Sequence, residues 1–109
     1  MNIYEKEGAE DKLIELYAKM LRLYPDAGIY NKLGILYSKK GFLDQAFQEF
    51  KSAVELNPAN GRFYNNLGIA YLQKGQQAEA LKCWEKALEL VPDLKEAREN
   101  LNRAKRVNE

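Results

Sequence analysis

Small and apolar residues recur along the chain with the spacing of amphipathic helices. Between residues 30 and 37 they fall at positions i, i+3, i+4 and i+7, which share one face of a helix. A similar spacing returns between residues 46 and 54, so the sequence predicts two consecutive helices. Gly41 lies between them and can adopt the backbone conformation that ends a helix, whereas Pro58 cannot continue a helix interior. The residues that define the two faces are Tyr30, Leu33, Gly34, Tyr37, Ala46, Phe50, Ala53 and Val54.

This pattern of two helices is repeated 34 residues further along the chain. The segment YNKLGILY at residues 30–37 aligns with YNNLGIAY at residues 64–71, and the register continues without a gap. Repetition at one fixed period predicts an array of stacked helix pairs, because each pair must bury its apolar face against the next. The further matches are Gly41 with Gly75, Ala46 with Ala80, Phe50 with Trp84, Ala53 with Ala87, Leu56 with Leu90, and Pro58 with Pro92.

The order of these residues resembles the tetratricopeptide repeat (TPR), whose pattern is an aromatic residue, Leu-Gly, Tyr, Ala, a second aromatic residue, Ala and Pro. The resemblance covers almost the whole chain. Pentatricopeptide repeats, which read RNA, have a close but different period and lack this Leu-Gly and Tyr pattern. The resemblance implies an all-α fold in which antiparallel helix pairs stack into a right-handed superhelix, an α-solenoid. It also implies a protein–protein interaction module rather than an enzyme.

A partial repeat precedes the two full ones. Gly8 aligns with Gly41 and Tyr17 with Phe50, at an offset of 33 residues. The first helix of this repeat is reduced to a stub, residues 1–7, in which Tyr4 is expected to pack on Tyr17. We therefore interpret the N-terminus as a cut inside a helix. The sequence predicts about seven helices, namely the stub and helices over roughly residues 9–23, 28–40, 43–56, 61–74, 77–90 and 93–107.

The last helix has the length of a first repeat helix, but its faces differ. Ala97, Leu101 and Ala104 lie on the side that contacts the preceding repeat, whereas Arg98 and Lys105 stand where a further helix would pack. Repeat arrays need such a polar-faced helix at their end for solubility. We therefore predict a capping helix and a C-terminus that is the true end of the array. The predicted organisation is one domain, 1–109, with a partial repeat at 1–26, repeats at 27–60 and 61–94, and the cap at 95–109.

Composition adds few candidates for chemistry. The net charge of +1 gives no electrostatic reason to expect nucleic acid or an anionic membrane as the main partner. Histidine is absent and Cys83 is the only cysteine, so the sequence offers no intramolecular disulfide, no Cys/His zinc cluster and no histidine base. The glycines are scattered at repeat joints rather than gathered in a phosphate-binding loop. We therefore expect no enzyme activity, no cofactor or metal, no membrane insertion, and a reducing, cytoplasmic location.

Cys83 and Trp84 each allow a functional interpretation and a structural one. Cys83 could be a redox-active thiol, and Trp84 could be a platform for a ligand. Because the chain has neither a second cysteine nor a histidine, we interpret Cys83 as a small, half-buried residue of the last repeat. Trp84 occupies the aromatic core position of the family that the chain resembles, so we interpret it as a packing residue.

The face opposite the Tyr30 and Tyr37 seam is the candidate binding surface. In TPR proteins this side of the first helices lines a concave groove, so the resemblance implies a site for an extended peptide. Amide side chains offer both a donor and an acceptor to a peptide backbone, and isoleucines add apolar contact. The alternative is that these polar residues are simply solvated. The candidate residues, whose side chains we expect to face water, are Asn31, Lys32, Ile35, Lys39, Arg62, Asn65, Asn66, Ile69 and Gln73, with Leu72 beside them.

A subset of the TPR family binds chaperone C-termini through a carboxylate clamp of Lys, Asn and Arg in three successive first helices. The sequence departs from this pattern. Asn66 matches one clamp position in the later frame, and Asn2 and Arg62 are the only matches in the earlier frame. We therefore do not expect the chain to bind chaperone tails. The four other positions of the later frame require Lys, Asn, Lys and Arg, and they hold Asn31, Ile35, Glu96 and Asn100.

Two classes of function remain open, besides a role as a regulatory segment of a larger protein. The first is an adaptor or scaffold that binds a peptide segment of a partner protein in the groove. The second is structural self-assembly, because a seven-residue stub cannot cover the apolar side of the next helix. In the isolated chain this second function predicts a two-fold homodimer through the N-terminal edge. The residues of that edge are Leu13, Leu16, Tyr17 and Met20.

Overall fold

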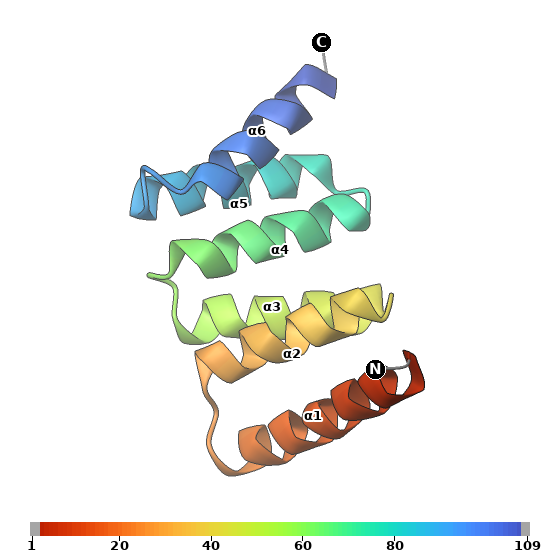
Figure 1. Ribbon diagram of the computed structural model, residues 1–109. Coiled ribbons are helices and arrows are strands. Elements are labelled where there is room, and N and C mark those ends of the chain that lie inside the picture. Colours follow the sequence, from red (N-terminus) through yellow and green to blue (C-terminus); the bar gives the residue numbers. More distant parts are fainter. Residues whose placement is uncertain (1–2, 108–109) are drawn as a thin grey trace.

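The computed structural model describes the backbone of residues 3–107 and the side chains of residues 8–106. Within residues 3–107 the chain forms six α-helices and no strand (Figure 1). From the second helix onward the ends lie within two residues of those predicted. The helices are α1 (Ile3–Leu23), α2 (Ala27–Lys39), α3 (Leu43–Leu56), α4 (Gly61–Gln73), α5 (Gln77–Leu90) and α6 (Lys95–Val107).

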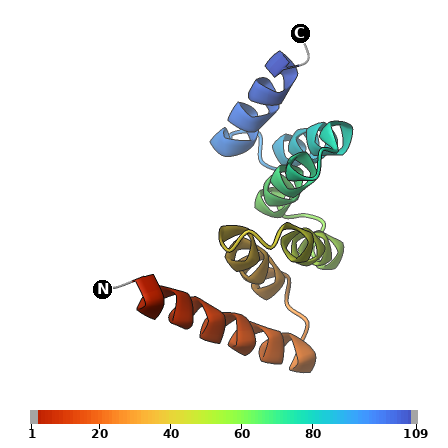
Figure 2. The ribbon, with the colours of Figure 1, turned by 90° about the vertical axis from the view of Figure 1, so that its right-hand side faces the viewer.

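The helices stack along one direction and give the domain extents of 43 × 31 × 23 Å. α2 packs antiparallel on α3 and α4 on α5, and α3 joins the two pairs by packing on α4 (Figure 1). α2, α4 and α6 line one side of the stack, while α3 and α5 line the other (Figure 2). α1 projects from the base of the stack toward the side of α2, α4 and α6. The fold is therefore the all-α solenoid of helix pairs that the repeat predicts.

Two glycines end the first helix of each pair. Gly41 has a φ of 82° and Gly75 a φ of 80°, a left-handed conformation that glycine adopts without steric cost. Just after Gly41, the amide of Phe42 donates a 2.9 Å hydrogen bond to the carbonyl oxygen of Tyr37, and the second turn repeats this bond. Such bonds satisfy carbonyl groups that the end of a helix leaves without partners. The predicted role of Gly41 is confirmed.

Close contact within each helix pair depends on two further glycines. A Cβ atom added to Gly34 would lie 2.7 Å from the ring of Phe50, and one added to Gly68 would lie 2.6 Å from Nε1 of Trp84. Both aromatic side chains are buried, and Trp84 is only 1% exposed. The predicted packing role of Trp84 is confirmed.

The N-terminal edge differs from the prediction. α1 is one continuous helix, so the expected division into a stub over residues 1–7 and a separate helix over residues 9–23 is wrong. A separate seven-residue helix would not be stable, whereas extending α1 adds a backbone hydrogen bond for each added residue. The expected contact of Tyr4 with Tyr17 involves a side chain outside the described residues. α1 packs mainly against α2, and its other side is open, with Leu16 52% and Met20 40% exposed.

α6 covers the end of the stack with its apolar side, as predicted for a cap. Ala97, Leu101 and Ala104 are buried, and Arg98 on the opposite side is exposed. Nε2 of Gln77 in α5 donates a 3.0 Å hydrogen bond to the main-chain oxygen of Ala104. That oxygen belongs to the last turn of α6, where carbonyl groups lack partners within the helix. None of the described helices is long and apolar enough to cross a membrane.

Candidate functional site

The side of the stack that α2, α4 and α6 share carries most of the predicted groove residues. These residues differ in how far their side chains are exposed to water. Cationic side chains are exposed, whereas most amide side chains are at least half-buried. The exposed members are Lys32, Ile35, Lys39, Arg62 and Gln73, and the half-buried ones are Asn31, Asn66 and Ile69.

Two asparagine pairs join the three helices. Nδ2 of Asn66 in α4 donates to Oδ1 of Asn31 in α2 at 2.9 Å, and Nδ2 of Asn100 in α6 donates to Oδ1 of Asn65 in α4 at 3.0 Å. Both pairs span 35 residues, so an asparagine that recurs one residue past the repeat period is the signal for them in the sequence. These bonds hold α2, α4 and α6 in fixed register, and they therefore fix the surface that a ligand would meet.

Asn65 is not a surface residue. Its side chain is 8% exposed and bonded to Asn100 of α6, and its main-chain oxygen accepts a 3.2 Å hydrogen bond from Nε1 of Trp84. The expectation that Asn65 faces water is therefore wrong, because α6 contacts the end of its side chain and Trp84 contacts its backbone. Asn65 therefore holds α6 against α4 instead of presenting its amide to solvent.

Two small hollows are lined by residues of this side. The first, here called the α2 hollow, has a volume of about 170 Å³ and lies between α1 and α2. It brings two residues of the predicted dimer edge next to two residues of the predicted groove. Its lining consists of Leu13, Tyr17, Lys32, Ile35 and Leu36.

The second hollow, here called the α6 hollow, has a volume of about 140 Å³ and involves α4, α5 and α6. Arg103, which lines this hollow, is not among the predicted groove residues, because the pattern of residues 93–107 predicts only a capping helix. The repeat period itself indicates this position, because Arg103 lies one period after Ile69 and two periods after Ile35, which are both predicted groove residues. The lining of the α6 hollow consists of Leu72, Gln77, Trp84, Asn100, Arg103 and Ala104.

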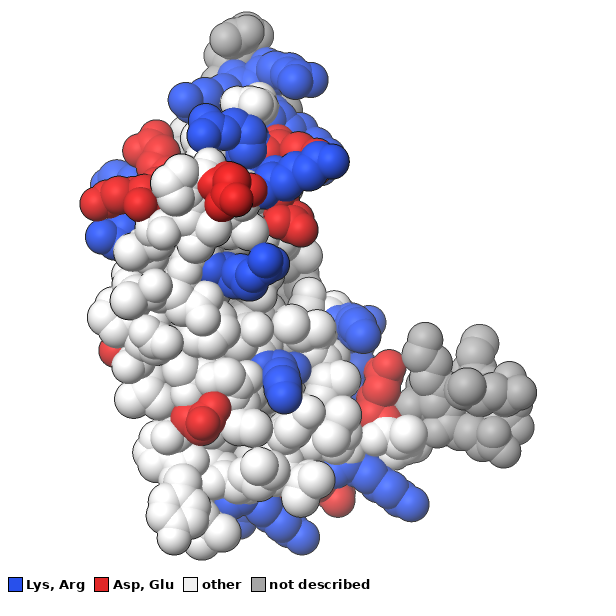
Figure 3. Space-filling model, turned by 60° about the vertical axis from the view of Figure 1, so that its left-hand side comes forward, with Lys and Arg blue, Asp and Glu red and all other residues white. Residues whose placement is uncertain are grey.

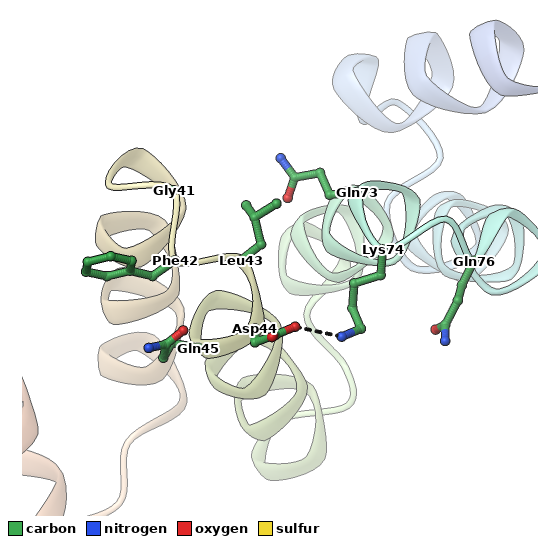
Figure 4. Close-up of a pocket in the computed structure, with 8 residues that line it drawn as sticks. All are labelled: Gly41, Phe42, Leu43, Asp44, Gln45, Gln73, Lys74 and Gln76. Atoms are coloured by element: carbon green, nitrogen blue, oxygen red, sulfur yellow. Dashed lines mark hydrogen bonds and ion pairs between the residues drawn. The ribbon is translucent and has the colours of Figure 1, made fainter.

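A larger hollow of about 700 Å³ lies at the edge of the stack, next to the turns that follow α2 and α4 (Figure 4). Leu43 and Gln73 approach each other from α3 and α4. Nζ of Lys74 lies 3.0 Å from Oδ1 of Asp44 and 5.0 Å from the ring centroid of Phe47. The charged groups of this edge hollow are thus already paired. Gln73, predicted as a groove residue, belongs to this edge.

Charge is distributed unevenly over the molecule. Lys and Arg side chains gather at the end formed by α6, whereas the middle of the face shown in Figure 3 is mostly uncharged. α6 contributes five Lys or Arg residues and two Glu residues. Arg103, which borders the α6 hollow, is exposed and makes no ion pair with any residue whose side chain is described. The same holds for Lys32 at the α2 hollow.

The one thiol of the chain is in a protected position. Cys83 is buried, more deeply than the half-burial predicted. Burial, with a smaller contribution from the charge of Glu79, raises the pKa of its thiol from 9.0 to about 11. The thiol therefore stays protonated near neutral pH, which makes it a poor nucleophile. Among the described residues, no group of three or more His, Cys, Asp or Glu is placed to hold a metal ion.

Comparison with known proteins places this architecture in a class and then in a family. A solved structure, the first TPR of Spaghetti (RPAP3) bound to the HSP90 peptide SRMEEVD, superposes with a TM-score of 0.86 at 27% sequence identity. The match covers 95% of this chain and 83% of that chain. A search of curated proteins by sequence found no match. The superposition on the solved TPR structure gives the class, which is that of α-solenoid interaction domains built from helix pairs.

Family models identify the repeat itself. A tetratricopeptide repeat model matches residues 61–94, and a TPR repeat model matches residues 36–75. Together the two matches run from residue 36 to residue 94 without a break. The chain belongs to the tetratricopeptide repeat family, whose domains act as protein-interaction modules.

Proposed function

We propose that the chain binds an extended peptide segment of a partner protein across α2, α4 and α6. One observation carries this proposal: two asparagine pairs hold these helices in register, and Lys32, Ile35 and Arg62 are exposed on the same helices. The TPR of Spaghetti, which holds a peptide in its solved structure, supports this use of the fold. The proposed contact residues are Asn31, Lys32, Ile35, Lys39, Arg62, Asn66 and Ile69, with Asn65 beneath them and Gln73 at the edge.

The half-buried asparagine pair suits a peptide backbone. Because Asn66 donates to Asn31, Oδ1 of Asn66 can still accept a hydrogen bond and Nδ2 of Asn31 can still donate one. An extended peptide presents N–H and C=O groups that need such partners. Lys32 follows Asn31 directly, and Arg62 lies one helical turn before Asn66. These two cations favour a segment that contains acidic residues.

The proposed ligand is an internal segment rather than a chaperone tail. Glu96 and Asn100 stand where the carboxylate clamp requires Lys and Arg. The amide of Asn100 is already bonded to Asn65, and the exposed carboxylate of Glu96 would repel a terminal carboxylate. The peptide SRMEEVD should accordingly bind no better with a free C-terminus than with an amidated one in a fluorescence anisotropy titration.

An array of 12-residue peptides tests the groove. Lys32→Glu combined with Arg62→Glu should weaken binding of the best peptide at least tenfold, about 1.4 kcal/mol, because both exposed cations are reversed. The matched control is Lys51→Glu with Lys82→Glu, which makes the same charge change at exposed positions of α3 and α5. The control should keep the parent affinity. The groove is rejected if the two double substitutions weaken binding equally. It is also rejected if Lys32→Glu with Arg62→Glu does not weaken binding.

Self-assembly is a second candidate, which the exposure of Leu16 and Met20 on α1 favours. The proposed assembly is a two-fold homodimer through α1, in which Leu13 and Tyr17 border the contact. Leu16→Lys with Met20→Lys should convert dimers to monomers in light scattering over a concentration series, because two charges are costly in an apolar contact. Leu56→Lys, at an exposed apolar position of α3, should leave the assembly unchanged. A parent chain that stays monomeric at high concentration rejects the dimer.

The wider role and location of the domain stay predictions. A peptide groove suits an adaptor or scaffold as well as a regulatory segment of a larger protein. Cys83 is unpaired and buried, which is compatible with the predicted reducing, cytoplasmic location.

A further inference from the structure

The α6 hollow combines an apolar interior with a charge at its border. Trp84 and Ala104 are buried beneath it, whereas Leu72 is 45% exposed. Arg103 is exposed beside them and forms no ion pair with a described residue. The volume of about 140 Å³ is close to that of an engineered cavity, about 150 Å³, that holds benzene. The hollow can therefore accommodate one aliphatic side chain.

The α2 hollow repeats this construction two repeats earlier. Tyr17 stands at the repeat position of Trp84, and Ile35 at the position of Arg103. The cation of this hollow is Lys32, which is exposed and likewise without an ion pair among the described residues. Each hollow thus places one cation, without an ion pair among the residues whose side chains are described, next to apolar side chains at the two ends of the proposed groove.

We propose that the α6 hollow is a specificity subsite for an aliphatic side chain that has Asp or Glu next to it in an extended peptide. This inference rests on the proposed peptide groove and names the class of its ligand. The aliphatic side chain would cover the exposed side chain of Leu72, with the buried Trp84 beneath it, and this contact is favourable in proportion to the apolar area covered. The neighbouring carboxylate would form a two-bond pair with the guanidinium of Arg103.

The edge hollow lacks this combination. Its cation, Lys74, is already paired with Asp44, so an acidic ligand would have to displace a carboxylate that the chain itself supplies. Arg103 and Lys32 require no such exchange. This difference favours the two groove hollows over the larger edge hollow as sites for an acidic peptide.

The size of the domain limits the spacing between two such contacts. The longest extent is 43 Å, and an extended residue spans about 3.3 Å. About 13 extended residues therefore cover the whole stack. A ligand that reaches both hollows carries two aliphatic residues, each beside an acidic one, within that length.

A combinatorial array of 12-residue peptides, acetylated and amidated at their ends, provides the probe. Peptides selected by the parent chain should be enriched in an aliphatic residue next to Asp or Glu. Arg103→Glu should abolish the preference for the acidic residue and weaken the best peptide at least tenfold, and Leu72→Ser should abolish the preference for the aliphatic residue. The matched controls are Arg98→Glu, on another side of α6, and Leu56→Ser on α3, both at exposed positions. They should leave both preferences unchanged.

Trp84 supplies a second readout, because it is the only tryptophan of the chain. Its fluorescence emission should shift when the best peptide saturates the parent chain, and it should not shift with that peptide on Arg103→Glu at the same concentration. Circular dichroism of all variants establishes that the helices are intact.

The outcomes separate the subsite from the groove. Selected peptides without the aliphatic and acidic pair overturn the subsite, as does equal binding by Arg103→Glu and Arg98→Glu. In either case the groove stands if Lys32→Glu with Arg62→Glu still weakens binding. Unchanged Trp84 emission at saturation also overturns the subsite. An array that yields no binder overturns the groove and the subsite together.

Discussion

Replacing Gly68 with alanine tests how tightly the second helix pair is packed. The new Cβ atom would lie 2.6 Å from Nε1 and 2.9 Å from Cε2 of Trp84. Trp84 is 1% exposed, and its Nε1 is bonded to the main-chain oxygen of Asn65 at 3.2 Å, so the indole cannot move without losing contacts. Overpacking of a core costs about 1–3 kcal/mol, and loss of the indole hydrogen bond costs about 1 kcal/mol more.

One contribution to the free energy of unfolding opposes this destabilisation. Alanine is favoured over glycine within a helix by about 0.5–1 kcal/mol. The net destabilisation of Gly68→Ala is therefore about 1–3 kcal/mol. At roughly 4–8 °C for each kcal/mol in a domain of this size, the melting temperature should fall by at least about 4 °C.

Gly8→Ala provides the matched control for this substitution. Gly8 lies inside α1, is exposed, and has nothing within 4 Å of an added Cβ atom. This substitution should leave the domain as stable as the parent or more stable, because only the helix preference acts. Thermal and urea unfolding followed by far-ultraviolet circular dichroism measures both variants. A Gly68→Ala variant with the stability of the parent would refute the close packing of α4 on α5.

Two further predictions concern buried groups. Asn65→Ala should lower the free energy of unfolding by about 1–3 kcal/mol in urea denaturation, because Asn100 loses its partner. The control, Asn102→Ala on the exposed side of α6, should change the free energy of unfolding by less than about 0.5 kcal/mol, and equal effects of the two substitutions would contradict the pairing. The Cys83 thiol has a folded pKa of about 11 against an ordinary 9.0, so the unfolded chain loses this proton first as pH rises. The free energy of unfolding should therefore be unaffected by this thiol below pH 9. Between pH 9 and about 11 it should fall, relative to that of Cys83→Ala, by up to about 1.4 kcal/mol per pH unit. Parallel curves of unfolding free energy against pH for the two chains would contradict the burial of the thiol.

The periodic part of the fold could be predicted from the sequence because the same residues both form and end each helix. Gly34 and Gly68 allow close approach, and Gly41 and Gly75 turn the chain with positive φ values. These requirements are local, and they recur at the repeat period. The N-terminal helix could not be predicted in the same way. Whether Gly8 ends a helix depends on a competition between a short separate helix and a longer continuous one, which the repeat alignment does not contain.

The candidate site could be predicted only in part. The exposure of Lys32 and Arg62 follows from their helix positions alone, and both were expected to be exposed. The burial of Asn65 and the location of Arg103 beside a hollow depend on how α6 packs on α4 and α5. That packing is set by contacts between residues of different helices, which a pattern within one helix does not contain. The sequence contains the 35-residue spacing of the asparagines, but only the packing of neighbouring helices shows that these asparagines bond to each other.

α6 covers the second helix pair and also borders the α6 hollow, and both positions depend on the same contacts. Asn100 ties α6 to Asn65 in the middle of the helix, and Gln77 ties it at Ala104, one residue from Arg103. A ligand that contacts Arg103 would therefore meet a side chain on a helix that is already fixed at two points, which reduces the entropy lost on binding. It follows that a substitution at Asn65, which a ligand cannot reach, should weaken both the cap and the affinity, because the residue that stabilises α6 also positions the cation beside the hollow.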